Sequence, residues 1–291
     1  MIGFVGLGSM GGAIVTRLLA AGEQVAVFDR SPALLQRFGD AGAHTASSVQ
    51  EVADRAEVVI ACVPDKDASI SVASEVMNGT AVRIHADLST IGCAAIREIE
   101  GQLRTKGIQV VDAPISGGRA AIENGTLSVM VAGEETALNR FEQVAKPFAG
   151  RITRIGNRVG QAQLCKLVNN GINFTAFLVS CEAVSVGVKA GIKPQVLLDV
   201  INAGTGRNSA TMDKIPRAIV PRTFDLGGPL GGVVKDLDLF LTEAALAGLP
   251  SGVIAHTRKM WSEAITAMDP ASDSSNIIRH FENILDVEVS G

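Results

Sequence analysis

Three glycines near the start of the chain, Gly6, Gly8 and Gly11, follow the pattern G-x-G-x-x-G. They come after an apolar stretch typical of a strand and open a run with helical periodicity, and Asp29 ends a second apolar stretch 18 residues after Gly11. This context is typical of a dinucleotide-binding βαβ unit: the first glycine permits a tight turn, the second lets backbone approach a pyrophosphate, and the third lets helix and strand pack closely. The alternative is a glycine-rich turn without a ligand, which the agreement of strand, glycines, helix and acid disfavours.

The dinucleotide interpretation predicts a nicotinamide cofactor and its contacts. The pyrophosphate is expected at the N-terminus of the helix that follows the glycines. Asp29 is expected to accept bonds from the adenosine ribose, which favours NAD because a carboxylate repels a 2′-phosphate. NADP is the alternative, since Arg30 and Ser31 would suit that phosphate. The contacts expected from this segment are Gly6, Leu7, Gly8, Ser9, Met10, Gly11, Asp29, Arg30 and Ser31.

Composition and charge argue against several other classes. The 291 residues suffice for two domains, and the net charge of −4 offers no basic footprint for nucleic acid. The four cysteines form no CxxC pair and the four histidines are scattered, so we expect no metal site and a reducing, cytoplasmic setting. No uninterrupted apolar run approaches the roughly 18 residues of a membrane span, and the first strand leaves no room for a signal peptide. We therefore expect neither a nucleic-acid nor a membrane partner.

The pattern of elements predicts an α/β fold in two domains. Over residues 1–160, strands alternate with helices, which predicts a Rossmann domain with a parallel, doubly wound sheet. Behind it, residues 161–291 show few strand signals and predict an all-α domain, led by a long interdomain helix over 160–189. The predicted strands are 2–7, 24–29, 58–63, 82–87, 109–113, 126–132 and 151–155, and the later helices are 194–203, 234–247, 253–267 and 275–285.

A proton-transfer group can be sought by elimination. The chain has no tyrosine and no clustered Cys/His ligands for a catalytic zinc, which leaves Lys, His, Asp, Glu or Cys. Lys166 is the best candidate, because Lys166, Asn170 and Asn173 share one helix face at i, i+4 and i+7, and Asn169 flanks it. Such a stripe is costly to bury unless it lines a polar cavity. A solvated helix face is an equally good explanation from the residues alone.

A second group of polar residues follows the strand that ends at Asp112. The stretch Asp112-Ala113-Pro114-Ile115-Ser116-Gly117-Gly118 lies where a doubly wound sheet places its ligand crevice. A Ser-Gly-Gly turn presents a hydroxyl and unhindered backbone N–H groups, which suit a carboxylate. An ordinary tight turn is the alternative.

Together these segments resemble the β-hydroxyacid dehydrogenase family, which includes 3-hydroxyisobutyrate dehydrogenases and tartronate semialdehyde reductases. The resemblance covers nearly the whole chain, with four motifs in the right order. Residues 6–11 match G-L-G-x-M-G, residues 112–118 match D-A-P-x-S-G-G, and residues 235–237 match K-D-L. The catalytic pattern of the family is matched by Gly156, Gly160, Lys166, Asn169 and Asn170.

The resemblance implies roles for these residues. Lys166 would be the catalytic acid/base, with Asn170 helping to hold the substrate. Lys235 would close the site from the helical domain. The carboxyl end of the substrate would be anchored by Ser116, Gly117 and Gly118 with Lys235, and further cofactor contacts would come from Val63, Pro64, Thr90 and Lys235.

Two departures from the family concern the substrate. Arg119 follows the Ser-Gly-Gly turn, where small or neutral residues are common in relatives, and residues 227–232 are unusually rich in glycine. Arg119 either adds a second cation, which would favour a substrate with an additional acidic or polar group, or points to solvent.

The predicted activity is NAD(P)-dependent hydride transfer between the nicotinamide and a small 3-hydroxy acid, or its semialdehyde. An imine reductase on the same scaffold and a non-catalytic dinucleotide-binding sensor are the alternatives; the combination of Lys166 with both asparagines disfavours the sensor. We also expect a homodimer or homotetramer, because the helix over 160–189 carries apolar residues on more than one face. Burial by the chain's own C-terminal helices is the alternative explanation of those residues.

Overall fold

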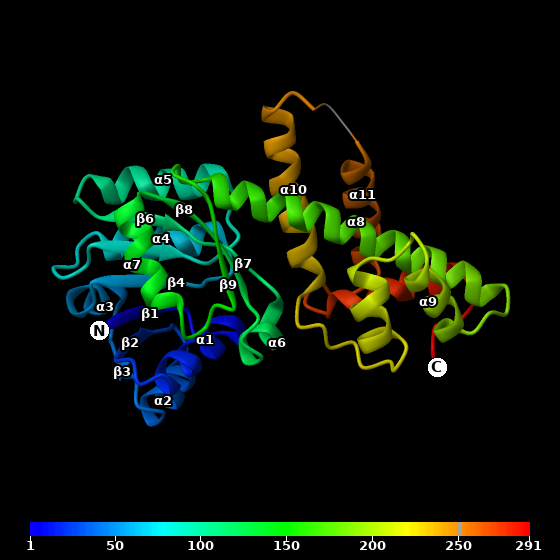
Figure 1. The fold of residues 1–291 in the computed structure, drawn as a ribbon, viewed down its shortest axis with the longest axis horizontal. Coiled ribbons are helices and arrows are strands. Elements are labelled where there is room, and N and C mark those ends of the chain that lie inside the picture. Colours follow the sequence, from blue (N-terminus) through cyan, green and yellow to red (C-terminus); the bar gives the residue numbers. More distant parts are fainter. Residues whose placement is uncertain (250–251) are drawn as a thin grey trace. The chain divides into compact units, whose positions relative to one another are not determined.

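The computed structural model describes residues 1–249 and 252–291, which form two compact units (Figure 1). The first unit is Met1–Lys166 and the second is Leu167–Gly291. The division falls within helix α8 (Gln161–Lys189), whereas the predicted boundary at residue 160 lies just before that helix.

The first unit is built on a sheet whose described strands follow the order β3-β2-β1-β4-β5-β6-β8-β7, with β9 paired to β8. From β3 to β6 every pair is parallel, as the alternation of strands and helices predicts. The strands are β1 (Ile2–Val5), β2 (Val25–Phe28), β3 (His44–Thr45), β4 (Val58–Ala61), β5 (Ile84–Asp87), β6 (Gln109–Asp112), β7 (Ile115–Ser116), β8 (Ser128–Gly133) and β9 (Arg151–Gly156).

Strand β8 departs from the predicted parallel order. It runs antiparallel to β6 and β7 and parallel to β9. Strands β7 and β8 are joined through one short helix, α6 (Gly118–Glu123). A connection of this length is at the lower limit for a parallel crossover, and here the chain turns back to form an antiparallel pair.

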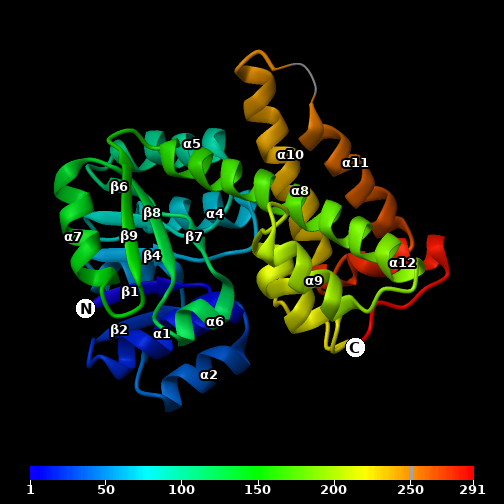
Figure 2. The ribbon, with the colours of Figure 1, turned by 45° about the vertical axis from the view of Figure 1, so that its right-hand side comes forward.

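Helices cover both faces of this sheet (Figure 2). Along β1, Phe4 packs into a core with Ile14 of α1 and Phe141 of α7, whereas the next residue, Val5, packs into a separate core with Val52 of α3. Successive strand residues point to opposite faces, so a strand buried on both sides is apolar throughout. The helices of this unit are α1 (Ser9–Ala20), α2 (Pro32–Asp40), α3 (Val49–Arg55), α4 (Lys66–Val76), α5 (Cys93–Arg104), α6 and α7 (Glu135–Ala145).

The second unit is helical and packs around Trp261. The rings of Phe174 and Phe177 on α8 lie 6.2 and 6.0 Å from the indole, and Trp261 itself is fully buried. One element was not predicted, the π-helix η1, which contains Pro216. The elements are the greater part of α8, α9 (Pro194–Ala203), η1 (Ala210–Ile219), α10 (Leu230–Leu246), α11 (Val253–Thr266), the 3₁₀-helix η2 (Ser274–Ile277) and α12 (Ile278–Leu285).

Helix α8 is the one described helix long and apolar enough, by length and composition, to cross a membrane. Within it, Phe177, Leu178, Cys181 and Val184 belong to the core of the second unit, whereas 39% of its most apolar 18-residue window is buried. The same helix carries Lys166, two adjacent asparagines and Asn173, which interrupt its apolar sequence.

Candidate cofactor and catalytic site

The three glycines of the first turn meet different constraints. Gly6 has a φ of +95°, and a Cβ there would lie 2.3 Å from the carbonyl oxygen of Cys62. A Cβ on Gly11 would lie 1.9 Å from the carbonyl oxygen of Gly6, so packing alone requires both glycines. A Cβ on Gly8 would meet no atom within 4 Å, and no side chain caps α1 after it. The turn therefore leaves open space beside the free N–H groups of a helix N-terminus, as a bound pyrophosphate requires.

Asp29, at the end of β2, joins this turn to the next loop. Its Oδ2 accepts the backbone N–H of Leu7 at 2.6 Å, and its Oδ1 accepts that of Ser31 at 2.8 Å. A carboxylate has about four acceptor positions, so two remain for ribose hydroxyls. Ser31 caps α2, and Arg30 is exposed beside it.

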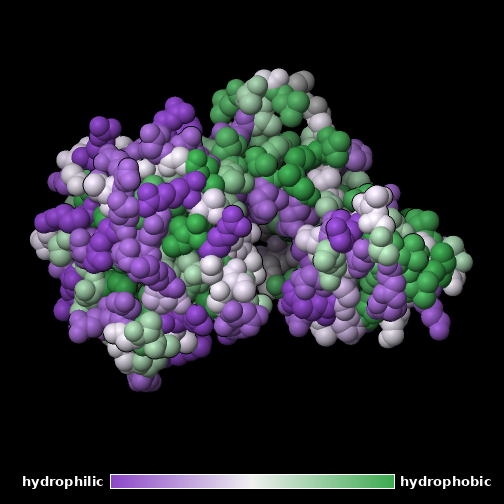
Figure 3. Space-filling view, in the orientation of Figure 1, coloured by the Kyte–Doolittle hydropathy of each residue, from purple (hydrophilic) through white to green (hydrophobic). Residues whose placement is uncertain are grey.

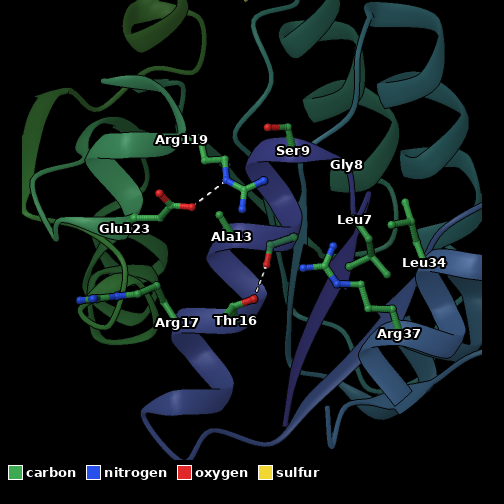
Figure 4. Close-up of a pocket in the computed structure, with 11 residues that line it drawn as sticks. Leu7, Gly8, Ser9, Ala13, Thr16, Arg17, Leu34, Arg37, Arg119 and Glu123 are labelled. Carbon is green, nitrogen blue, oxygen red and sulfur yellow. Dashed lines mark hydrogen bonds and ion pairs between the residues drawn. The ribbon is translucent and has the colours of Figure 1, made fainter. Parts of the chain in front are cut away.

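A cavity of about 400 Å³ opens beside the glycine turn, between α1, α2 and α6 (Figure 4). The guanidinium of Arg119 reaches toward Ser9, and that of Arg37 lies on the opposite wall near Leu7. Arg119 also forms an ion pair with Glu123 at 2.7 Å. Arg119 therefore lines the same cavity as the glycine turn, and these cations suit a phosphate-bearing ligand there.

The other predicted cofactor residues follow β4 and β5. The backbone N–H of Val63 donates to the Oγ of Ser89 at 2.9 Å, which ties the loop of Val63 and Pro64 to the loop of Thr90. The backbone N–H of Ser89 in turn donates to the buried carboxylate of Asp87 at 2.8 Å. Asp87 and Ser89 were not among the predicted site residues. Their signal lies in the sequence Asp87-Leu88-Ser89-Thr90, where only Thr90 was assigned a role.

The Ser-Gly-Gly turn lies between β7 and α6. Ser116 ends β7 and is half-buried, and the next two residues adopt φ values of +129° and +68°. Residues with a side chain rarely adopt such positive φ values, so the turn itself requires glycine at positions 117 and 118. Asp112, in the same sequence motif, is four residues before Ser116 and faces the start of α8 instead.

On α8, Lys166 and Asn170 are both buried, at 9% and 5% exposure. The Asn170 amide donates to Oδ2 of Asp236 at 2.7 Å, and the other oxygen of Asp236 lies 3.0 Å from the Nζ of Lys235. The second unit thus brings Asn170 and Lys235 together through Asp236. Sequence reasoning missed Asp236, although it is the central residue of the K-D-L motif.

Asn173, one turn further along α8, binds a lysine that sequence reasoning also missed. Its Oδ1 accepts the Nζ of Lys214 at 2.5 Å and the hydroxyl of Ser209 at 3.2 Å. Burial lowers the pKa of Lys214 to about 8. Lys214 lies on the π-helix η1, which places its side chain beside Asn173.

Two buried cysteines and a buried histidine are poorly suited to proton transfer. Burial raises the pKa of the Cys62 thiol to about 12, and burial also raises the pKa of Cys181. Burial lowers the pKa of His85 to about 4, and neither ring nitrogen of His85 has a hydrogen-bond partner. These groups keep one protonation state near neutral pH, where a general acid/base must change its state.

Comparison with known proteins covers both units. The family model for the NAD-binding domain of 6-phosphogluconate dehydrogenase matches residues 1–156, and the NAD-binding model of NADP-dependent 3-hydroxyisobutyrate dehydrogenase matches residues 160–281. The chain is 30% identical to L-threonate dehydrogenase of Cupriavidus necator, over 97% of this chain and 96% of that protein. It is also similar to the solved 3-hydroxyisobutyrate dehydrogenase of Mycobacterium tuberculosis with L-serine, with a TM-score of 0.86, 29% identity and coverage of 96% and 98%.

Imine reductases share the fold at a greater distance. The structure of the Streptomyces aurantiacus imine reductase has a TM-score of 0.66 at 17% identity, with coverage of 96% and 98%. That likeness concerns the fold alone. From the two family models and the extended identity to hydroxyacid dehydrogenases, we conclude that the chain belongs to the β-hydroxyacid dehydrogenase family of NAD(P)-dependent oxidoreductases.

Proposed function

We propose that the protein interconverts a small 3-hydroxy acid and its semialdehyde, with Lys166 as the residue that transfers the proton. The observation that carries this proposal is the buried polar face of α8, where Lys166 is followed one turn later by an asparagine fixed by Asp236. Polar groups are buried at a cost unless they serve a bound partner or one another. Relatives named for threonate, 2-(hydroxymethyl)glutarate and 3-hydroxyisobutyrate support a hydroxy acid as the substrate class.

The chain's own residues account for the steps around the hydride transfer, which the bound nicotinamide supplies. In oxidation, the neutral amine of Lys166 accepts the hydroxyl proton; in reduction, its ammonium form donates that proton. Asn170, held by Asp236, helps to hold the substrate. For the substrate carboxylate, Ser116 and the two glycines after it offer a hydroxyl and backbone N–H groups, and Lys235 offers an ammonium group.

Carboxylate binding is tested by comparing a hydroxy acid with its amide at fixed saturating cofactor. We expect Lys235→Ala to lower kcat/KM for the acid about 10–100-fold and to change that for the amide little, because charge-assisted bonds contribute roughly 1.5–3 kcal/mol. Lys259→Ala is the control, since Lys259 is an exposed lysine of the same unit that pairs with Glu263. Equal losses for acid and amide would contradict the anchoring role. If wild-type protein turned over neither compound nor any other hydroxy acid of a panel, the proposed function itself would be wrong.

We propose NAD as the preferred cofactor. The position of Asp29 at the end of β2, where its carboxylate faces the glycine turn, supports this preference. We expect kcat/KM to favour NAD, and Asp29→Asn to raise the use of NADP relative to NAD by roughly tenfold, because about 1.4 kcal/mol of charge repulsion corresponds to that factor. Asp40→Asn, on an exposed helix end of the same unit, is the control. A wild-type ratio in favour of NADP would refute the preference.

We also propose a homodimer or homotetramer. Among the described residues, most exposed large hydrophobic side chains belong to the second unit, and Val168, Ile172, Val179 and Val186 form a stripe on α8. Figure 3 shows hydrophobic surface over α8 and at the neighbouring ends of α10 and α11. A patch of this kind marks an interaction surface. Sedimentation should give a mass above the 30.2 kDa of one chain at micromolar concentration, and Ile172→Glu should lower it. A wild-type monomer under those conditions would contradict the proposal.

A further inference from the structure

Gln163 lies on the first turn of α8. Both the oxygen and the nitrogen of its side-chain amide form hydrogen bonds within the first unit. The side chain is fully buried. Its Oε1 accepts the backbone N–H groups of Ile91 and Gly92, each at 3.0 Å. Its Nε2 donates to the carbonyl oxygen of Ser89 at 2.9 Å and to Oδ1 of Asp112 at 3.2 Å. One side chain thus satisfies three backbone groups of the loop after β5 and one carboxylate at the end of β6.

The partner of Gln163 caps the helix that carries Lys166. Oδ2 of Asp112 accepts the backbone N–H groups of Gly160, Ala162 and Gln163 at 2.8, 3.0 and 3.1 Å. These are among the N–H groups that a helix leaves unpaired at its N-terminus, and a carboxylate is the best partner for them. The cap fixes the direction of the first turns of α8, where Lys166 lies.

The other end of this network reaches two loops assigned to the cofactor. Ser89, whose carbonyl oxygen accepts from Gln163, also accepts the N–H of Val63 and donates its own N–H to Asp87. The network therefore runs without interruption from the loop of Val63, through the loop of Thr90, to the start of α8. Every hydrogen bond in it lies within the first unit.

We propose that Gln163 is a positioning residue: it sets the place of Lys166 relative to the loops that hold the cofactor. This inference rests on the proposed function. A misplacement of about 1 Å in a catalytic group can lower a rate about 10²-fold. Neither an apolar residue nor a carboxylate reproduces the amide, because the site requires an acceptor and a donor in one planar group.

The test compares Gln163→Met and Gln163→Glu with the control Gln161→Met. Gln161 is the same residue type on the same turn, but its Oε1 accepts only the local N–H of Arg158 at 2.9 Å. We expect Gln163→Met to lower kcat at least tenfold in the direction of aldehyde reduction, and the control to stay within about twofold of wild type. Calorimetric titration with the reduced cofactor should show a Kd raised a fewfold for Gln163→Met, because the loops of Val63 and Thr90 lose their tie to α8. A kcat unchanged in Gln163→Met, with only a lower Tm, would overturn the proposal.

Gln163→Glu adds a second measurement, the pH dependence of kcat, which would not change if Gln163 only stabilised the fold. It keeps the acceptor for Ile91 and Gly92 but sets a second carboxyl beside Asp112, and two adjacent carboxyl groups share one proton as the pH falls. We expect its kcat, divided by that of wild type, to rise about tenfold from pH 8 to pH 5.5, whereas the Gln163→Met ratio stays low throughout. A flat ratio for Gln163→Glu would overturn the proposal.

Other ionisable groups near Gln163 are common to all variants. Asp87 is reached through Ser89, the thiol of Cys93 donates to the carbonyl oxygen of Gly160, and the side chain of Arg97 borders Gly160. Their titration, like that of Asp112 itself, is also present in Gln163→Met, so the Gln163→Met ratio is the control for it. The failure of this inference is distinguishable from that of the proposed function, because a full rate in Lys166→Ala would disprove the role of Lys166, whereas a full rate in both Gln163 variants would disprove only the positioning.

Discussion

Lys166→Ala is expected to lower kcat about 10²–10⁴-fold, the usual contribution of a general acid/base. Lys166 is buried on α8, and the chain has no tyrosine to replace it. Cys62 and His85 do not change protonation near neutral pH, because burial raises the pKa of Cys62 to about 12 and lowers that of His85 to about 4. Steady-state kinetics in both directions, at saturating cofactor, measure the loss.

Two controls make this result specific. Lys189→Ala removes an exposed lysine from the last turn of the same helix and should leave kcat unchanged. Calorimetric titration should show that Lys166→Ala still binds the cofactor, since the residue is proposed to act on the substrate proton. If Lys166→Ala kept more than about a tenth of the wild-type kcat, another group would transfer the proton.

Asp112→Ala is expected to lower the free energy of unfolding by about 3 kcal/mol. The substitution leaves three N–H groups at the start of α8 without their acceptor and takes one partner from Gln163. The loss of a helix cap costs roughly 0.5–2 kcal/mol, and an unsatisfied buried group roughly 1–3 kcal/mol. Urea unfolding at pH 7 measures the change, and Asp65→Ala, which removes one exposed cap from α4, should cost about 1 kcal/mol.

The difference in unfolding free energy between wild type and Asp112→Asn is expected to depend on pH, and the raised pKa of Asp112 sets the direction of that change. Burial raises the pKa of Asp112 from its ordinary 3.8 to about 6, against the opposing effect of the bonds from Gln163, Gly160 and Ala162. Folding therefore favours the protonated acid, and that contribution to stability is complete below about pH 3.8 and is lost as the pH rises through about 6. Relative to the asparagine variant, which does not titrate, wild type should lose about 2 kcal/mol between pH 4.5 and pH 7.5. A constant difference between the two proteins would contradict the raised pKa.

The features best predicted from the sequence are those determined by residues close together along the chain, such as strands and the glycine turn. Strands such as β1 and β4 are continuous apolar runs, and the glycine turn has its strand, helix and Asp29 within 30 residues. The contact between Asp112 and Gln163 joins residues 51 positions apart, and no local pattern reports it. Both residues lie in segments singled out from the sequence, yet Asp112 was read as part of a ligand site rather than as a helix cap.

Two features of the fold cannot be predicted from the spacing of apolar residues along the sequence. Strand β8 runs antiparallel to β7 after the single short helix α6, whereas alternating strands and helices predict only that a further strand exists. Pro216 argues against an α-helix over 210–219, because it lacks the N–H that an α-helix needs. The chain is helical there all the same, in the wider π form, and this form was not predicted.

The unequal constraints on Gly6, Gly8 and Gly11 also indicate how the sequence would change if the protein lost its cofactor during evolution. Selection for a folded protein alone would retain Gly6 and Gly11, since any side chain at either position meets backbone atoms. At Gly8 a Cβ would meet no atom of the protein within 4 Å, so the bound dinucleotide, and not the packing of the protein, requires glycine there. In a descendant that kept the fold but gave up the dinucleotide, position 8 would therefore be the first of the three to drift. Among homologous sequences, the residue at position 8 should separate chains that bind the cofactor from chains that merely inherit its scaffold.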